Sequence, residues 1–218
     1  MMLYWGFRAL KLLEDIERVT RKLAPGPAPS FNEAHVIKAL EIIGDYRSVG
    51  RIRLSRALDL GEGTTRTLLR HMKNEGMIHG SRMGISLSED GKALFSNLRD
   101  KLSEGVEVPS SRLTVGPFNV AILVRDSAQA VKSGMEQRDV AIKSGASGAT
   151  TLVFSGKKLS MPTREEDISI SMPSLHDQLV TKFKPKENDV IIVGSGENRE
   201  IAEIGAKMAA IKLLKYKN

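Results

Sequence analysis

The chain contains no cysteine, and this absence excludes disulfide bonds, thiolate metal sites and a cysteine nucleophile. Histidine is scarce: no two of the four, His35, His71, His79 and His176, lie at a metal-binding interval on one helix. We therefore expect no metal site and no cofactor. No apolar run approaches the roughly 20 residues that cross a bilayer. Charged residues interrupt the N-terminal apolar residues from Arg8 onward, too early for a signal peptide, so we expect a cytoplasmic protein.

Length and charge set the next limits. The 218 residues are enough for two domains of ordinary size. Lys and Arg number 33 against 26 Asp and Glu, which gives a formal charge of +7. This balance is compatible with a nucleic-acid partner without establishing one. We predict an amphipathic helix and a proline-rich linker over residues 1–29, one domain over residues 30–104 and a second over residues 112–218.

Residues 48–91 carry the most specific pattern in the chain. They predict two short helices separated by a glycine-bearing turn, then a strand, a tight basic turn and a second strand. The first helix is expected over about residues 49–58, and the turn over residues 59–61. Its core-facing side chains are predicted to be Ile52, Leu54, Ala57 and Leu58. This order of elements is the plan of a winged helix-turn-helix.

The second helix of this stretch is predicted to begin near Glu62 or Gly63 and to end at Gly76, because a glycine past the last turn ends a helix at low steric cost. Its inward stripe consists of Leu68, Leu69 and Met72. We therefore expect its polar side chains to point outward: Thr64, Thr65, Arg66, Thr67, Arg70, His71 and Lys73.

The same residues resemble a known superfamily. Residues 54–78 are similar to the helix-turn-helix of bacterial and archaeal winged-helix transcription regulators, and residues 85–95 are similar to their second wing strand and following helix. The whole chain resembles an uncharacterised archaeal family in which such a domain precedes an α+β domain. The resemblance implies DNA binding by the first domain and carries no known activity or ligand for the second.

Residues 3–23 place leucine, isoleucine, valine and phenylalanine at three- and four-residue steps, which predicts an amphipathic helix. The proline-rich residues 24–30 end it. Its apolar stripe either packs on its own chain or pairs with a second subunit, and both alternatives stay open. A further helix is expected from residue 30 onward, with Ser30 or Asn32 as its cap and Glu33 in its first turn.

Beyond a second linker at residues 105–111, the pattern changes from helical to alternating. The expected order is a strand, a helix divided near Gly134, a hairpin turning at residues 155–157, a strand over residues 167–172, a helix, a central strand and a closing helix. The predicted fold class is therefore α+β: a winged helix-turn-helix followed by an α+β sandwich, ferredoxin-like or related.

The candidate DNA contacts follow from the fact that an α-helix fits the major groove and reads base edges from its beginning. Between Arg47 and Arg82 the sequence holds eight Lys or Arg against three acids, a local charge of +5. This concentration favours DNA over the alternative, ordinary solvated charges on a fold used for protein contacts. The predicted DNA-binding residues are Arg53, Thr64, Thr65, Arg66, Arg70, Lys73, His79 and Arg82.

Two glycine-bearing loops of the second domain are candidates for a ligand site. Small residues beside a helix start allow backbone amides to hold an anion. The candidate ligand-binding residues are Gly145, Gly148, Gly194, Ser195, Gly196 and Asn198, and the candidate ligand is a small anionic metabolite. Tight turns with Ser195 or Asn198 as a cap explain the same pattern, and the spacing of a dinucleotide site or a P-loop is absent.

Together these observations predict a DNA-binding transcription regulator, a homodimer with a ligand-responsive second domain, and no enzymatic activity. Two alternatives stay open. One is a small-molecule enzyme with an appended winged-helix domain, although the sequence offers no catalytic set. The other is a winged-helix module for protein interaction.

Overall fold

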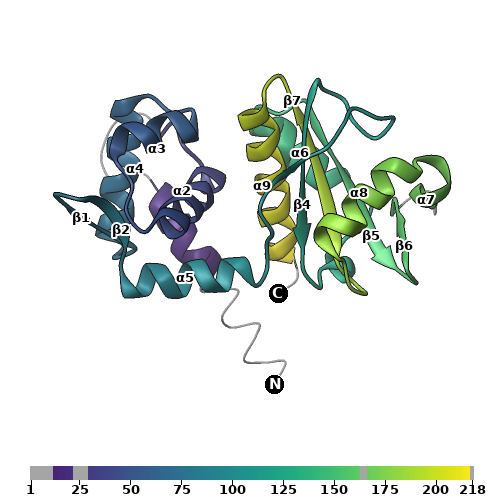
Figure 1. Cartoon of the computed structure of the whole chain (residues 1–218), viewed down its shortest axis with the longest axis horizontal. Helices are drawn as coiled ribbons and strands as arrows, with labels where there is room; N and C mark the ends of the chain where they lie inside the picture. Colours follow the sequence, from purple (N-terminus) through teal and green to yellow (C-terminus); the bar gives the residue numbers. More distant parts are fainter. Residues whose placement is uncertain (1–11, 22–28, 163–165, 217–218) are drawn as a thin grey trace. The chain divides into compact units, whose positions relative to one another are not determined.

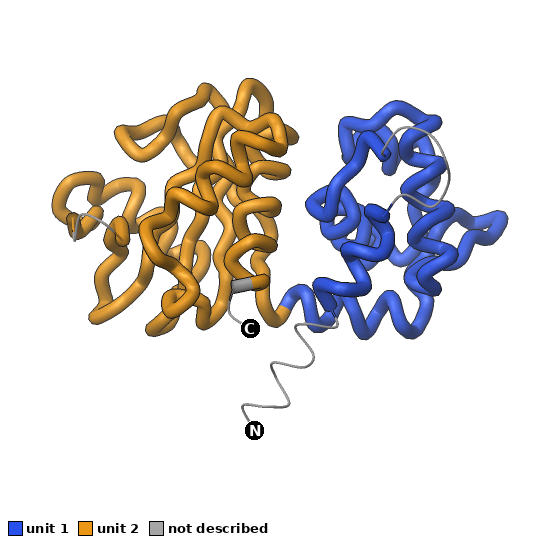
Figure 2. The backbone as a smooth tube through the Cα atoms, turned by 180° about the vertical axis from the view of Figure 1, so that it is seen from behind, with its two compact units in different colours: residues 1–99 blue, residues 100–218 orange. Residues whose placement is uncertain are grey.

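A computed structural model describes residues 12–21, 29–162 and 166–216. The chain divides into two compact units, Met1–Arg99 and Asp100–Asn218, drawn in blue and orange in Figure 2. Each unit is described by itself below. Among the described residues, no helix is long and apolar enough to cross a membrane.

Unit 1 combines helices with one small antiparallel hairpin (Figure 1). From residue 33 onward its elements are α2 (Glu33–Tyr46), α3 (Arg51–Leu58), α4 (Glu62–Asn74), β1 (Ile78–Ser81), β2 (Gly84–Leu87) and α5 (Glu89–Arg99). The predicted helix, turn, helix and hairpin order is thereby confirmed. Asn32 caps α2, since its side chain accepts a hydrogen bond from the backbone N–H of His35.

The core of unit 1 forms where α2, α3 and α4 meet. Ile37 and Leu40 of α2, Leu54 of α3, and Leu68 and Met72 of α4 are completely shielded from solvent. The turn between α3 and α4 depends on Asp59, which adopts the left-handed conformation with φ 52°. Ile52 departs from the prediction because its side chain is 55% exposed. Ile52 is two residues from the buried Leu54, a rotation of about half a turn, so it lies on the outer side of α3.

The hairpin is fixed to the helices by the segment between α2 and α3. The backbone N–H groups of Val49 and Ile85 each donate to the other residue's carbonyl at 2.9 Å. The Ser48 hydroxyl donates to the Met83 carbonyl at 2.7 Å. Gly84 has φ +123° and lies so close to Ser48 that an added Cβ would collide with it. The position of the hairpin is therefore defined by backbone pairing and not only by its own turn.

A helical segment at residues 12–20 packs on unit 1, where it buries Leu12, Leu13, Ile16 and Val19. The Val19 carbonyl lies 2.8 Å from Nδ1 of His71, and the Arg18 side chain donates to Glu75 at 2.8 Å. Of the two alternatives for this helix, packing on its own chain is the one observed for its described part. The predicted residues 3–11 and most of the proline-rich spacer lie outside the described residues.

Unit 2 contains a five-stranded, wholly antiparallel sheet in the order β3-β4-β7-β5-β6. Its elements are β3 (Val106–Glu107), β4 (Phe118–Val124), η1 (Ala128–Ala130), α6 (Met135–Lys143), β5 (Gly148–Ser155), β6 (Lys158–Ser160), α7 (Ile168–Ser171), α8 (Pro173–Phe183), β7 (Val190–Gly196) and α9 (Arg199–Tyr216). The last strand, β7, is central and pairs with both β4 and β5.

The sheet is covered on both faces (Figure 1). Ala121, Leu123, Ile191 and Val193 point to the side of α7 and α8 and form one apolar cluster with their buried residues. The alternate positions of the same strands, such as Ile192, point to α9, which also contacts α6. Alternation along each strand thus supplies two separate cores, one on each side of the sheet.

The coarse prediction of a mixed α+β fold is confirmed, with two corrections. Residues 168–171 are helical and not a strand, because the Asp167 side chain caps a short turn by accepting from the Ser169 N–H at 2.9 Å. Hydrogen bonding from the Ser169 hydroxyl, and to a smaller extent from the Ser169 N–H, lowers the pKa of Asp167. Residues 105–111 are not only a linker, since they include β3, the edge strand of the sheet.

The strand order also excludes the ferredoxin-like alternative. In that arrangement the last strand lies at an edge of the sheet beside the first strand, whereas here the last strand, β7, lies between β4 and β5. The helix α6 still joins two parallel strands, β4 and β5, but β7 lies between them.

Candidate nucleic-acid interface

One stripe of α4 is basic and exposed. Arg66, Arg70 and Lys73 are spaced by four and three residues, so they share one side of the helix. All three are exposed, whereas Leu68, Leu69 and Met72 on the opposite side are buried. The helix begins after Gly61 without a side-chain cap, and Gly61 and Gly63 are exposed. The start of α4 and its basic stripe are therefore accessible together.

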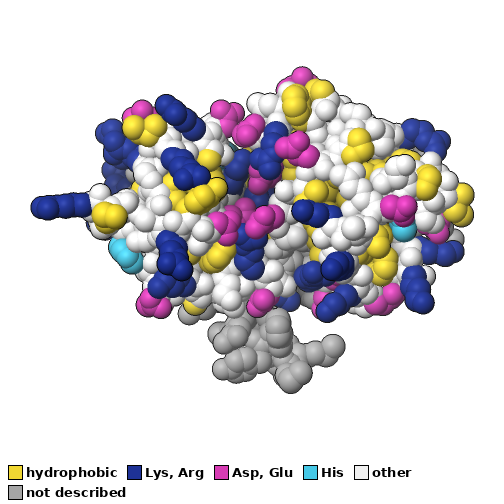
Figure 3. All heavy atoms as spheres, in the orientation of Figure 1, with side chains coloured by type: hydrophobic (Ala, Val, Ile, Leu, Met, Phe, Trp, Pro, Cys, Tyr) yellow, Lys and Arg dark blue, Asp and Glu magenta, His cyan; other side chains and the backbone are white. Residues whose placement is uncertain are grey.

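Further cations come from α3 and the residues before it. Arg47, Arg51, Arg53 and Arg56 are all exposed. The guanidinium of Arg53 lies 3.9 Å from the centre of the Tyr46 ring, which holds the side chain by a cation–π contact at the end of α2. Figure 3 shows dark-blue cationic side chains over the helices and hairpin of unit 1.

The hairpin carries two more predicted residues. Arg82 lies in the turn between β1 and β2, and His79 lies on β1 opposite Ser86; both are exposed. The Ser81 hydroxyl accepts from the Met83 N–H at 3.1 Å and donates to the Gly84 carbonyl at 3.3 Å, so the turn is tied across. We call the exposed cations between residues 47 and 82 the basic surface: Arg47, Arg51, Arg53, Arg56, Arg66, Arg70, Lys73 and Arg82.

Two residues of α4 do not point outward as predicted. Thr65 is fully buried, and its hydroxyl donates to the Gly61 carbonyl at 3.1 Å, one turn earlier. His71 is buried against Phe31, with its Nδ1 bonded to the Val19 carbonyl. Thr65 lies within the apolar stripe, one turn before Leu68 and Leu69, and His71 lies on its edge. Polar groups are tolerated there because each finds a hydrogen-bond partner. Thr64 is half-buried at the start of the helix.

Three acidic residues lie among the cations of residues 47–82, and they offset only a small part of the positive charge. Asp59 and Glu62 are exposed at the turn. Glu75 is paired with Arg18 from the helical segment at residues 12–20, and this ion pair raises the pKa of the Arg18 guanidinium. One of the three acids is thus compensated by a residue outside the stretch.

The two predicted ligand loops of unit 2 lie side by side. Gly148 pairs with Ser195 across β5 and β7, and the Ser147 N–H donates to the Ser195 carbonyl at 2.8 Å. Asn198 caps α9 by accepting from the Ile201 N–H at 2.8 Å. The two loops that were predicted to share a site are therefore adjacent in the structure. Asn198 is a helix cap, which is the structural explanation offered for its loop.

The glycines of these loops have structural roles. An added Cβ at Gly194 would overlap the Ala202 carbonyl, and one at Gly196 would lie 2.8 Å from the Ala202 nitrogen, so both let α9 approach β7. Gly145 has φ +97°, which favours glycine. The Ser195 hydroxyl donates to the Asn119 side-chain oxygen at 2.7 Å and accepts from the Val115 N–H at 3.2 Å.

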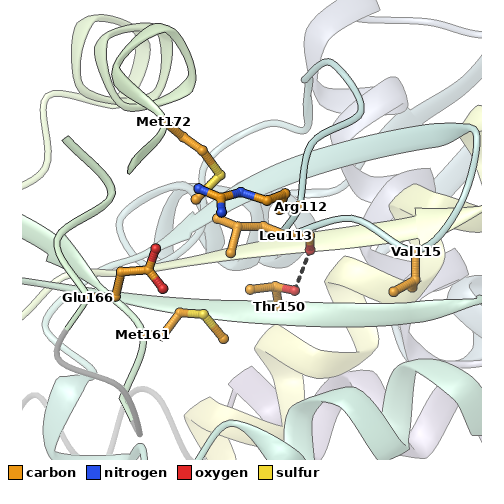
Figure 4. A pocket seen from close by; sticks show the side chains of 7 residues that line it. All are labelled: Arg112, Leu113, Val115, Thr150, Met161, Glu166 and Met172. Carbon is orange, nitrogen blue, oxygen red and sulfur yellow. Dashed lines mark hydrogen bonds between the residues drawn. The ribbon is translucent and has the colours of Figure 1, made fainter. Parts of the chain in front are cut away.

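A pocket of about 290 Å³ lies beside these loops, on the α7 and α8 side of the sheet (Figure 4). It was not found from the sequence, because its residues come from three separate segments and no motif links them. Its lining residues are Arg112, Leu113, Val115, Thr150, Met161, Glu166 and Met172. Within the described part of the chain, no group of three or more His, Asp or Glu could hold a metal ion.

The geometry of unit 1 defines a helix-turn-helix with a wing-like hairpin and a basic surface. Comparison with protein families agrees: residues 35–102 match the family model described as the CggR N-terminal DNA binding domain. Residues 115–213 match the model described as a domain of unknown function, DUF4443. The chain thus joins a segment similar to a DNA-binding domain to a second, uncharacterised domain.

A solved structure is similar over most of the chain. It is the hypothetical protein PH0730 from Pyrococcus horikoshii OT3, with 28% sequence identity and a TM-score of 0.66. The similarity covers 83% of this chain and 92% of that one. No curated protein matches this chain. The predicted resemblance to DNA-binding regulators and to an archaeal two-domain protein is confirmed by these matches.

Proposed function

We propose that this protein is a transcription regulator that binds double-stranded DNA through a winged helix-turn-helix in unit 1. The observation that carries this proposal is the exposed basic stripe on α4, located in a segment that matches a DNA-binding domain model. In the proposed complex α4 enters the major groove and the β1–β2 hairpin lies on the adjoining backbone.

The proposed contacts divide by their chemistry. Thr64 and Arg66, in the first turns of α4, are assigned to base edges, since an arginine can bond guanine bidentately. Arg70 and Lys73 lie farther along the stripe and are assigned, with Arg53, His79 and Arg82, to phosphates. Thr65 is left out because it is buried.

The remaining parts of the proposal concern the whole protein. We infer that it acts as a homodimer inside the cell, because regulators of this kind recognise two half-sites with a two-fold axis. Unit 2 is assigned to assembly or to sensing a small ligand, and no enzymatic role is proposed for it. The two glycine loops remain a candidate anion site, but their structural roles favour the neighbouring pocket as the place where a ligand binds.

The test is a DNA selection from a random pool followed by fluorescence anisotropy at several salt concentrations. Arg66→Ala is expected to weaken binding to the selected site by about 1–3 kcal/mol and to relax base preference at one position. Arg70→Ala is expected to weaken binding to all sequences and to reduce the salt slope by about 1.

Arg138→Ala is the matched control, because Arg138 is an exposed arginine of α6 in unit 2. It is expected to change neither affinity nor slope. Circular dichroism verifies that all three variants are folded. Unchanged affinity of both unit 1 variants at controlled salt would contradict the proposed surface. Absence of DNA binding together with a stable protein partner would favour an interaction module instead.

A further inference from the structure

The pocket of unit 2 is bordered by the loop at residues 112–115, which hydrogen bonds hold over the sheet. The Thr150 hydroxyl, on β5, donates to the Leu113 carbonyl at 2.6 Å, and the Val115 N–H donates to the buried Ser195 hydroxyl at 3.2 Å. On the other side Arg112 donates to the Ser171 carbonyl at 3.4 Å, which connects the loop to α7. The pocket is therefore held in shape from two sides.

Two opposite charges face the interior. Figure 4 shows the guanidinium of Arg112 and the carboxylate of Glu166 directed into the same space, from the loop and from the segment before α7. In Figure 4 the two charged groups lie apart, on different sides of the pocket. Arg112 has five N–H donors, and its bond to Ser171 uses one.

Apart from Thr150, the rest of the lining is apolar. Leu113 and Val115 come from the loop, and Met161 and Met172 come from either side of Glu166. Methionine side chains are unbranched and adapt to ligands of different shape. The pocket thus offers one cationic group, one anionic group and an adaptable apolar wall between and beside them.

We propose that this pocket binds a free α-amino acid with an apolar side chain. Arg112 binds the carboxylate, Glu166 binds the ammonium group, and Met161 and Met172 contact the side chain. The volume of about 290 Å³ is just below the roughly 300–1,000 Å³ of typical ligand pockets, which suits a small ligand such as an amino acid. A phosphorylated metabolite fits less well, because Glu166 would repel its charge.

This inference concerns unit 2 and does not depend on the proposal that unit 1 binds DNA. Calorimetry without DNA tests it, so a failure of either proposal leaves the other standing. The full-length protein is titrated at pH 7 with L-methionine, L-leucine, L-isoleucine, L-valine and L-phenylalanine. Binding of at least one of them is expected, and absence of binding for all five at millimolar concentration would overturn the proposal.

Two derivatives of the ligand test which of its charged groups the pocket binds. For the best amino acid of the series, the N-acetyl derivative lacks the ammonium charge and the amide lacks the carboxylate. Each is expected to bind about tenfold to a hundredfold more weakly, since each loses one charge-assisted hydrogen-bonding group. An N-acetyl derivative that binds as tightly as the parent would indicate a plain carboxylate site and contradict the amino-acid assignment.

Two variants assign the charges to residues. Arg112→Gln is expected to weaken binding of the parent amino acid about tenfold to a hundredfold. It is expected to leave the already weak affinity for the amide unchanged, since the amide has no carboxylate for Arg112 to bind. Glu166→Gln is expected to weaken binding of the parent amino acid by a similar factor and to leave the affinity for the N-acetyl derivative unchanged. Lys182→Gln, at an exposed cation of α8, is the control and keeps the parental affinity. Wild-type affinity for the parent amino acid in both pocket variants, with unchanged circular dichroism, would place the ligand elsewhere.

Discussion

At the scale of single residues, two adjacent threonines of α4 have different roles. The Thr65 hydroxyl is buried and bonded to Gly61, whereas Thr64 is half-buried at the start of the helix. We expect Thr65→Val to lower the free energy of unfolding by about 1 kcal/mol, the usual net value of one hydrogen bond, and to leave DNA affinity unchanged.

Thr64→Val is expected to do the opposite: near-wild-type stability and DNA affinity reduced several-fold. Chemical denaturation and fluorescence anisotropy measure the two effects on the same preparations. Loss of DNA affinity in the Thr65 variant alone would contradict this division of roles.

The lowered pKa of His35 leads us to expect that the stability of the fold depends on pH. Burial, with a smaller contribution from the charge of Lys38, lowers its pKa from 6.5 to about 4. Since the unfolded chain binds the proton more readily, this residue stabilises the fold fully above about pH 6.5, and the contribution is lost as the pH falls toward 4. Urea denaturation between about pH 4.5 and about pH 7.5, which covers most of the interval in which the contribution is lost, measures the loss.

The comparison variant is His35→Gln, because glutamine at this position retains a capping box with Asn32. It is expected to flatten the pH dependence. His79→Gln, at an exposed position of β1, is expected to leave it as in the wild type. If both variants titrate alike, His35 is not the group responsible.

At the scale of elements, the packing of α9 on β7 depends on glycine. An added Cβ at Gly194 would overlap the Ala202 carbonyl and lie 2.7 Å from the Ala206 nitrogen. We expect Gly194→Ala to lower the free energy of unfolding by about 1–3 kcal/mol, as overpacking does. Gly80→Ala, where nothing lies within 4 Å of the added atom, is the control and is expected to be near neutral. Thermal unfolding followed by circular dichroism distinguishes the two; equal melting temperatures would contradict the packing role.

The same elements explain where sequence reasoning succeeded. The periodicity of α3 and α4, the glycine at Gly76 with φ +72° and the β5–β6 turn with its positive φ values at Lys157 and Gly156 are local features. The strand predicted over residues 167–172 was wrong because alternation over a few residues also fits a single capped helical turn. The short strand β3 was not predicted because two residues are too few to show a periodicity.

At the scale of the whole molecule, the proposed dimer predicts a molar mass. Sedimentation equilibrium of the full-length protein is expected to give twice the 23.9 kDa of one chain. The selected DNA site is then expected to contain two inverted half-sites about 10 base pairs apart, or a multiple of that spacing. A monomer that binds a single asymmetric site would contradict the two-fold arrangement but not DNA binding itself.

The sequence by itself determined the helix-turn-helix, the concentration of basic residues around it and the change to an α+β pattern in the second half. These depend on periodicity, turn residues and charge, which are encoded within short windows. Only the tertiary structure decided that Thr65 and His71 are buried, that β7 lies between β4 and β5, and that Arg112 and Glu166 face one pocket. Each of these depends on contacts between segments distant in the chain, and long-range pairing leaves no local signal that a single sequence can reveal.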